Sequence, residues 1–378
     1  MKYSTVIAFR MLVHNKARCM LALCAIAFAV LVLFMAIGFF NGLNDSQANI
    51  AAHLNADLVM LNKKTRSINS FRRMDRARLY QALAFPEIRE VVPVYEGQVG
   101  MITPASGMGK RVGYRAFPVG SAPFLINGRP LETDLLKEKG AILFDTLSRS
   151  IYGDVRTGMS VEIIGLKHRV VGSVRMGPNF SQNGYVLMSD TTYAAPRDPW
   201  VMDQISYGLL RVAKGTDIPA LRQRVLAQLP DDILIMTPEE LRVREIFFTT
   251  RTTPVGALLG IGLIVGFIIG IIICYQILFN EVTDHMPQFA TLKAVGFSTR
   301  FLVGVVMKEA LLLSVIGYLP GLLAGHVLYT VIEQTTRIIM ILTPGRGLSV
   351  FLLTIFMCCI AGFIAVRKVL AADPAELF

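Results

Sequence analysis

The sequence predicts an α-helical membrane protein with four transmembrane helices and an α+β extracytoplasmic domain inserted between helices 1 and 2. Only 17% of its 378 residues are charged and 53% are hydrophobic, whereas soluble domains have about 25% charged residues. The apolar residues gather in four long blocks, each long enough to span a bilayer. A long stretch of ordinary charged sequence separates the first block from the other three, and this stretch predicts the inserted domain.

The first block, residues 19–44, has no charged side chain. A signal peptide would have an apolar region of about 7–15 residues and then a small-residue cleavage site. This block is longer and lacks such a site, so we expect an uncleaved transmembrane helix. Ahead of it, Val6, Phe9 and Val13 recur at helical spacing among basic residues, which predicts a cytoplasmic interfacial helix over residues 1–18.

Residues 45–251 form the predicted extracytoplasmic domain, and its two ends have similar patterns. Near each end we expect a strand, a helix and a strand, which together predict a split, ferredoxin-like module. The first unit comprises Ala56–Leu61, Asp75–Ala84 and Glu90–Tyr95. The second comprises Ile205–Val212, a helix capped by Asp217 with Pro219 in its first turn, and Ile233–Met236.

The middle of the domain, about Arg111–Met188, is predicted to be inserted β structure. Strands Ser160–Ile164 and His168–Val174 are expected to form a hairpin joined at Gly165–Lys167. After the domain, Thr237 is expected to cap a helix that opens with Pro238, Glu239 and Glu240 and leads to the second span.

The other predicted spans are residues 252–280, 300–332 and 348–366, with a periplasmic loop over 333–347 and a cytoplasmic tail over 367–378. Four spans place both termini on one side of the membrane. The positive-inside rule makes that side the cytoplasm, because basic residues precede the first span and follow the last: Lys2, Arg10, Lys16, Arg18, Arg367 and Lys368.

The net charge of +11 does not indicate nucleic-acid binding, because the basic residues are scattered and lack interleaved aromatics. We also expect neither a metal site nor a disulfide framework in the external domain. All five cysteines lie in the apolar blocks: Cys19, Cys24, Cys274, Cys358 and Cys359.

The loop between the second and third spans, residues 281–299, predicts a short amphipathic cytoplasmic helix. Asp284 is expected to cap it, with His285, Met286 and Pro287 in the first turn. Phe289 and Leu292 share one face, and Gly296 suits the left-handed position after the end. The helix either fits the groove of a partner or lies on the lipid surface, and the residue pattern leaves both open.

Two sets of residues within the spans stand out. Gly317, Gly321 and Gly325 recur every four residues, as do Gly262, Gly266 and Gly270, and such faces predict close helix packing, either within a protomer or across a dimer. Pro320 is expected to kink the third span. Lys308 and Glu309 lie where this span enters the membrane; the ionisable Glu309 is either functional or part of an interfacial structure.

The sequence contains no pattern for catalysis. Gly107–Arg111 lacks the spacing and the Ser/Thr of a Walker A motif, and neither a Gly-x-Ser-x-Gly elbow nor a His-Glu-x-x-His pair occurs. We therefore expect a non-enzyme without its own cofactor, whose energy source is another chain.

The stretch Asn280-Glu281-Val282-Thr283-Asp284-His285-Met286-Pro287-Gln288-Phe289-Ala290-Thr291-Leu292-Lys293-Ala294-Val295-Gly296-Phe297 resembles the conserved block of FtsX/MacB-type ABC permeases. Asp284-His285-Met286-Pro287-Gln288 replaces the usual Arg and Glu, which favours the DevC subgroup. The resemblance extends to the pre-span residues Ala8, Arg10, Leu12, Asn15, Lys16 and Arg18, to Ala56-Asp57-Leu58, to Arg78–Leu83, to Glu309 and to Asp373–Glu376.

The resemblance implies a type VII ABC fold in which this block is the coupling helix that contacts the ATPase. By the match to the block, the coupling residues are Asp284, His285, Gln288, Phe289, Thr291, Leu292, Lys293 and Gly296. The implied partners are a cytoplasmic ABC ATPase dimer, which binds ATP and Mg, and a second copy of the permease.

The DevC resemblance further implies a bacterial inner-membrane exporter with a periplasmic membrane-fusion adaptor and an outer-membrane channel. The implied cargo is a glycolipid or another amphiphile. Two alternatives remain: an FtsX-type permease that extracts lipoproteins or regulates cell-wall enzymes, and a membrane-anchored sensor or binding protein.

Overall fold

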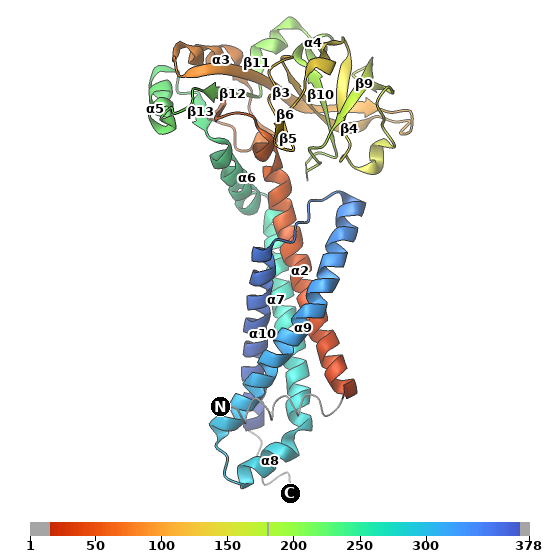
Figure 1. Ribbon diagram of the computed structural model, residues 1–378, viewed down its shortest axis with the longest axis vertical. Coiled ribbons are helices and arrows are strands. Elements are labelled where there is room, and N and C mark those ends of the chain that lie inside the picture. Colours follow the sequence, from red (N-terminus) through yellow and green to blue (C-terminus); the bar gives the residue numbers. More distant parts are fainter. Residues whose placement is uncertain (1–15, 180, 371–378) are drawn as a thin grey trace. The chain divides into compact units, whose positions relative to one another are not determined.

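The structure is a computed structural model, and it describes residues 16–179 and 181–370 (Figure 1). Most of the predicted interfacial helix, residues 1–18, and of the predicted tail, residues 367–378, lies outside these residues. The chain divides into two compact units. One is a helical unit of residues 1–42, 257–334 and 340–378; the other is an α+β unit of residues 43–256 and 335–339.

Among the described residues, four helices are long and apolar enough to cross a membrane, and most of their length belongs to the helical unit. They are α2 (Lys16–His53), α7 (Pro254–Asp284), α9 (Thr299–Thr336) and α10 (Pro344–Leu370). The short helix α8 (Met286–Ala294) joins α7 to α9 (Figure 1). Because the α+β unit is inserted between the first and second of these helices, the predicted fold class is confirmed.

Helix α2 continues beyond residue 44, where the apolar block ends. Its last part, from Asp45 to His53, is polar at several positions but contains no proline or glycine that would break the helix. Ile50 and Ala51 from this part are buried in the α+β unit. Hydropathy therefore marks the end of the apolar stretch, and the helix itself ends later.

The two ends of the α+β unit form the predicted ferredoxin-like module. Strands β1 (Leu58–Asn62), β3 (Ile88–Ile102), β12 (Tyr207–Val212) and β13 (Ile233–Met236) lie in the order β13-β1-β12-β3, and all neighbours are antiparallel. Helix α3 (Arg76–Gln81) connects β1 to β3, and α5 (Ile218–Gln228) connects β12 to β13. This β-α-β, β-α-β order confirms the prediction.

Two predicted cap residues, one in this module and one just after it, are confirmed as well. Asp217 accepts a hydrogen bond from the Ala220 N–H at 3.1 Å at the start of α5. Thr237 and Glu240 form a capping box at the start of α6 (Pro238–Thr252). In a capping box the two side chains satisfy backbone N–H groups that have no partner within the helix.

The inserted middle of the unit is a closed ring of six strands. The second half of β3 pairs with β4 (Lys110–Phe117), and the sheet continues through β10 (Tyr185–Ser189), β7 (Ala141–Asp145), β9 (Leu166–Val174) and β8 (Ser160–Ile163). Strand β8 pairs back with β3. Closure leaves no free sheet edge in this ring.

Shorter elements complete the unit. Strand β2 (Met74–Asp75) pairs with β11 (Gln204–Ile205), β5 (Leu125–Ile126) pairs with β6 (Arg129–Pro130), and α4 (Asp190–Ala194) follows β10.

The β8–β9 hairpin turns one residue earlier than predicted. Ile163 pairs with Leu166, so the turn consists of Ile164 and Gly165, with φ of 52° and 73°. A two-residue hairpin turn of this type requires positive φ at both positions. Gly165 indicated a turn, but a β-branched residue such as Ile164 rarely adopts positive φ. The predicted turn therefore begins one residue too late.

Both faces of the ferredoxin-like sheet are buried. Along β1, Leu58 and Met60 pack with Leu79 of α3 and Leu221 of α5. The alternate residues Val59 and Leu61 face the opposite core cluster, which includes residues from the last part of α2 and Leu241 of α6. Successive side chains on a strand point to opposite faces, so β1 connects two cores.

A buried ion pair lies where β3 passes from one half of the unit to the other. Glu96 on β3 and Arg115 on β4 face each other in register, and their side chains form two hydrogen bonds of 3.2 and 3.4 Å. The Tyr207 hydroxyl donates to Glu96 at 3.2 Å, and the Arg115 guanidinium stacks 3.9 Å from the Tyr185 ring centre. Removing one partner of such a pair leaves an unpaired buried charge and costs about 3–5 kcal/mol.

Candidate functional site

Helix α8 is held against the bundle by one apolar face. Phe289, with 4% of its surface exposed, belongs to a buried cluster. Leu292 is half-buried against the same cluster, whose other buried members come from α7, α9 and α10: Val282, Leu302, Val305, Val306 and Val366. The inner face of α8 is therefore fixed to three long helices.

The opposite face of α8 is open. Pro287, Gln288, Thr291 and Lys293 are exposed. Val295, just after the last turn, has 73% of its surface exposed. This face of α8, with polar side chains beside the exposed Val295, is therefore accessible to another protein.

The start of α8 differs from the prediction that Asp284 caps it. Asp284 is the last residue of α7, and His285 occupies the N-cap position without a side-chain cap. The His285 N–H donates to the Glu281 carbonyl at 3.2 Å, so the α7 hydrogen-bond ladder continues through Asp284. A residue with helical backbone geometry cannot serve as an N-cap.

The end of α8 agrees with the prediction. Gly296 has φ of +100°. Its N–H donates to the Lys293 carbonyl, and the Phe297 N–H donates to the Leu292 carbonyl, both at 3.1 Å. These two bonds define a Schellman motif, which needs a left-handed residue.

Asp284 and Glu281 lie beside a second feature, an open cavity of about 410 Å³ between α2 and α7. Leu21 and Ala22 of α2 and Asn280 of α7 also line it. The His285 Nε2 lies 3.7 Å from a Glu281 carboxylate oxygen, and its Nδ1 lies 2.5 Å from the Gln288 side-chain oxygen. His285 thus connects the cavity wall to the first turn of α8.

The predicted coupling residues therefore fall into three groups. Gln288, Thr291 and Lys293 are exposed on α8, and Phe289 and Leu292 hold the helix in place. Asp284, His285 and Gly296 lie at its ends. Val295, which the sequence analysis did not single out, is also exposed, at helical spacing from Gln288 and Thr291.

The glycine face of α9 packs on α2 within one protomer. A Cβ added at Gly317 would lie 2.7 Å from Ile26, one at Gly321 would lie 2.6 Å from Val30, and one at Gly325 would lie 3.1 Å from Phe34. The Tyr329 hydroxyl, further along α9, donates to the Phe34 carbonyl. The structure thus answers the question that the sequence left open, and α9 continues unbroken through Pro320.

The second glycine series, on α7, has mixed surroundings. A Cβ at Gly266 would lie 3.5 Å from Ala36, and one at Gly270 would meet Met357, whereas Gly262 faces open space. The Cys358 and Cys274 sulfur atoms lie 3.6 Å apart near the same contact between α7 and α10.

Glu309 lies inside the helical bundle, with 1% of its surface exposed. Neither of its carboxylate oxygens has a hydrogen-bond partner among residues 16–179 and 181–370. The adjacent Lys308 is only half-buried, as expected for neighbours that point in different directions on a helix.

Two family models match the chain. The MacB-like periplasmic core domain matches residues 19–228, and the FtsX-like permease C-terminal region matches residues 259–374. The chain belongs to the FtsX/MacB-like ABC transporter permeases. Permeases of this family are dimeric and pair with an ABC ATPase that is a separate subunit. This permease is accordingly a multi-pass inner-membrane protein with a periplasmic domain.

Solved structures that resemble the permease are periplasmic or extracellular regions. The periplasmic region of MacB from Actinobacillus actinomycetemcomitans has a TM-score of 0.37 and 10% identity, covering 52% of the permease and 94% of that chain. The extracellular domain of the noncanonic ABC-type transporter YknZ from Gram-positive bacteria has a TM-score of 0.33 and 8% identity, covering 48% and 100%. No curated protein matches the permease significantly.

Proposed function

We propose that the permease transmits ATP-driven motion of a cytoplasmic ATPase to its periplasmic domain and so drives export. In this proposal both termini and α8 face the cytoplasm. The observation that carries it is the two-sided character of α8. One face is buried against α7, α9 and α10 through Phe289, while the other presents Thr291 and Val295 to a partner.

The division of α8 into two faces assigns roles to its residues. Gln288, Thr291, Lys293 and Val295 meet the ATPase. Phe289 and Leu292 pass the displacement to the long helices, because closely packed side chains move together. ATP and Mg are bound by the ATPase, and this chain needs no cofactor of its own.

The wider assembly follows from the likeness of residues 280–297 to the DevC subgroup. We propose that the permease works with a membrane-fusion adaptor and an outer-membrane channel and that its cargo is a glycolipid or another amphiphile. An amphiphile delivered to the periplasmic domain need not cross a cavity between the membrane helices, so small-residue packing such as Gly321 against Val30 suits this mechanism.

The test is a charge change on the exposed face of α8. Thr291→Arg combined with Val295→Arg is expected to weaken co-purification with the cognate ATPase by about tenfold or more, because unpaired charges at an interface are costly. ATPase stimulation by the permease should fall in parallel. Leu166→Asp, at another exposed apolar residue in the β8–β9 hairpin, is the control and should change neither measurement.

The opposite result has a clear meaning. If the α8 variant remains folded by size-exclusion chromatography and still binds and stimulates the ATPase as the unmodified permease does, α8 is not the coupling element. The alternative that it merely lies on the lipid surface would then hold.

A further inference from the structure

The periplasmic domain has an open basic pocket of about 1060 Å³. One wall is the loop that follows β1, residues 63–73, and the other is α6. Six cationic side chains line it: Lys63, Lys64, Arg66, Arg72, Arg73 and Arg244. Like charges gathered around a concavity raise the local potential and attract anions.

The loop is closed by its own hydrogen bonds. At its neck, the Asn62 side-chain N–H donates to the Arg73 carbonyl at 2.9 Å, and the Arg72 N–H donates to the Thr65 hydroxyl at 3.0 Å. The Lys64 N–H donates to the Asn62 side-chain oxygen at 2.9 Å. These bonds hold the arginines of the loop on one wall.

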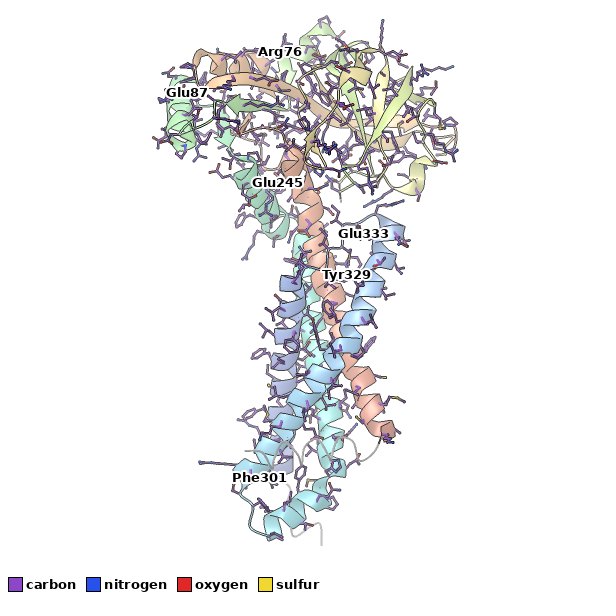
Figure 2. All side chains as sticks on the ribbon, in the orientation of Figure 1. Arg76, Glu87, Glu245, Phe301, Tyr329 and Glu333 are labelled. Atoms are coloured by element: carbon purple, nitrogen blue, oxygen red, sulfur yellow. The ribbon has the colours of Figure 1, made fainter. Side chains whose placement is uncertain are left out.

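Helix α6 fixes the loop from the other side through a buried carboxylate, that of Glu245, labelled in Figure 2. It accepts hydrogen bonds from the Ser67 hydroxyl at 2.6 Å and from the Ile68 N–H at 2.8 Å. The neighbouring Arg244 donates to the Thr65 carbonyl. Because both walls are fixed before any ligand arrives, binding would not have to order them.

The positive charge of this pocket is largely unbalanced. Lys63 pairs with Asp231, but Lys64, Arg66, Arg72 and Arg73 have no carboxylate partner among the described residues. Elsewhere in the domain several arginines do have one, as Arg78, Arg211, Arg222 and Arg224 do. The cluster therefore suits an anion that the chain itself does not supply.

Four of the six cations are arginines, whose guanidinium groups match phosphate and carboxylate oxygens with paired hydrogen bonds. The surroundings of the pocket favour a phosphate on a lipid over an acidic protein surface. Apolar residues on the same helix are also exposed, Val243 by 54% and Phe247 by 65%, and Phe248 lines the pocket. Cations beside exposed aromatic residues are typical of binding to lipid headgroups. Helix α6 also precedes the membrane helix α7 directly in the chain.

We propose that this pocket binds the phosphate-bearing headgroup of an anionic lipid. The binding does not depend on the export proposed above, because it needs neither ATP nor a particular cargo. A failure of ATPase coupling would therefore leave it standing, and the reverse also holds.

The test uses the full-length permease in neutral maltoside micelles. Fluorescent phosphatidylglycerol and fluorescent phosphatidylcholine are titrated in parallel, with glycerol phosphate and a poly-glutamate peptide as competitors. Phosphatidylglycerol should bind more tightly than phosphatidylcholine. Arg72→Ala combined with Arg73→Ala should weaken the binding of phosphatidylglycerol by about tenfold or more, since hydrogen bonds to charged groups are strong. Replacing both arginines by lysine should give a smaller loss, because lysine lacks the paired donors.

A control and three outcomes keep the proposal falsifiable. Arg89→Ala with Arg129→Ala removes the same charge at exposed positions outside the pocket and should leave binding unchanged; an equal loss would reduce the effect to net charge and overturn the site. Phosphatidylcholine carries the same phosphate beside a cationic choline, so equal affinity for both lipids would overturn the preference for an anionic headgroup. Competition by glycerol phosphate at the lipid's own concentration would overturn the lipid assignment in favour of a soluble phosphate, and stronger competition by poly-glutamate would favour an acidic protein. Unchanged melting temperatures verify that the variants are folded.

Discussion

Glu245 shows how one buried carboxylate shapes a surface. It lies on the inner face of α6 with 1% of its surface exposed, and its two oxygens hold the loop that carries the pocket arginines. Burial raises the pKa of Glu245, and the hydrogen bonds from Ser67 and Ile68 offset only part of that effect. The folded protein therefore binds a proton at this site more readily than the unfolded chain does.

This pKa shift predicts the direction in which the stability of the folded protein changes with pH. A carboxyl group whose pKa is raised by folding contributes stability below its ordinary pKa of 4.5, and that contribution is lost as the pH rises through the folded-state value. Glu245→Gln has no such group, so its melting temperature relative to the unmodified permease should rise between pH 4.5 and pH 8. Thermal unfolding across this range measures the difference.

A matched control lies on the same helix. A hydrogen bond from Arg242 lowers the pKa of the exposed Glu239, so Glu239→Gln should show a smaller pH trend of the opposite sign. A melting-temperature difference for Glu245→Gln that does not vary with pH would show that Glu245 titrates as an ordinary carboxyl group.

At the scale of elements, the contact between α9 and α2 depends on the absence of side chains. Gly317, Gly321 and Gly325 face Ile26, Val30 and Phe34, so two regular series of positions, four residues apart on each helix, meet face to face. Without a hydrophobic driving force between helices in lipid, close backbone approach of this kind supplies the packing energy.

Gly321→Ala tests this contact. The new methyl group would lie 2.6 Å from Val30 and 3.0 Å from the Ala27 carbonyl, and such overpacking costs about 1–3 kcal/mol, so the melting temperature in detergent should fall. Gly262→Ala, where the added group meets open space, should leave it unchanged or raise it slightly, since alanine favours helix. Equal responses of the two variants would mean that α9 does not pack on α2 through its glycines.

At the scale of the whole molecule, both proposals require the same orientation of the permease in the membrane. The basic pocket requires that the α+β unit is periplasmic, and the coupling role requires that α8 is cytoplasmic.

Cysteine labelling tests both locations in one experiment, in a background whose five native cysteines are replaced by alanine. A membrane-impermeant maleimide should label Lys214→Cys in intact spheroplasts but should label Lys293→Cys only after permeabilisation. Both positions are exposed, so accessibility within the protein does not limit either reaction; labelling of Lys293→Cys in intact spheroplasts would exclude the proposed topology.

Much of the fold was predictable because its signals are local. Long uncharged blocks, cap residues such as Asp217 and Thr237, and the left-handed Gly296 each depend on a few neighbouring residues. The ferredoxin-like module was also predictable, since its strand–helix–strand order repeats along the chain. The cap at Asp284 was predicted wrongly because its polar side chain suits a cap, whereas the backbone of α7 continues through it.

The sequence by itself determined that this protein spans the membrane four times, carries one large inserted domain and has a short helix between its second and third spans, because hydropathy and capping are properties of neighbouring residues. Only the tertiary structure decided which side chains of that helix are buried, that the α9 glycines pack on α2, that β8 closes the ring onto β3, and that Arg244 of α6 shares one pocket with the cations of the loop after β1. These facts depend on contacts between residues far apart in the chain, and no local pattern of charge or hydrophobicity encodes which of them meet.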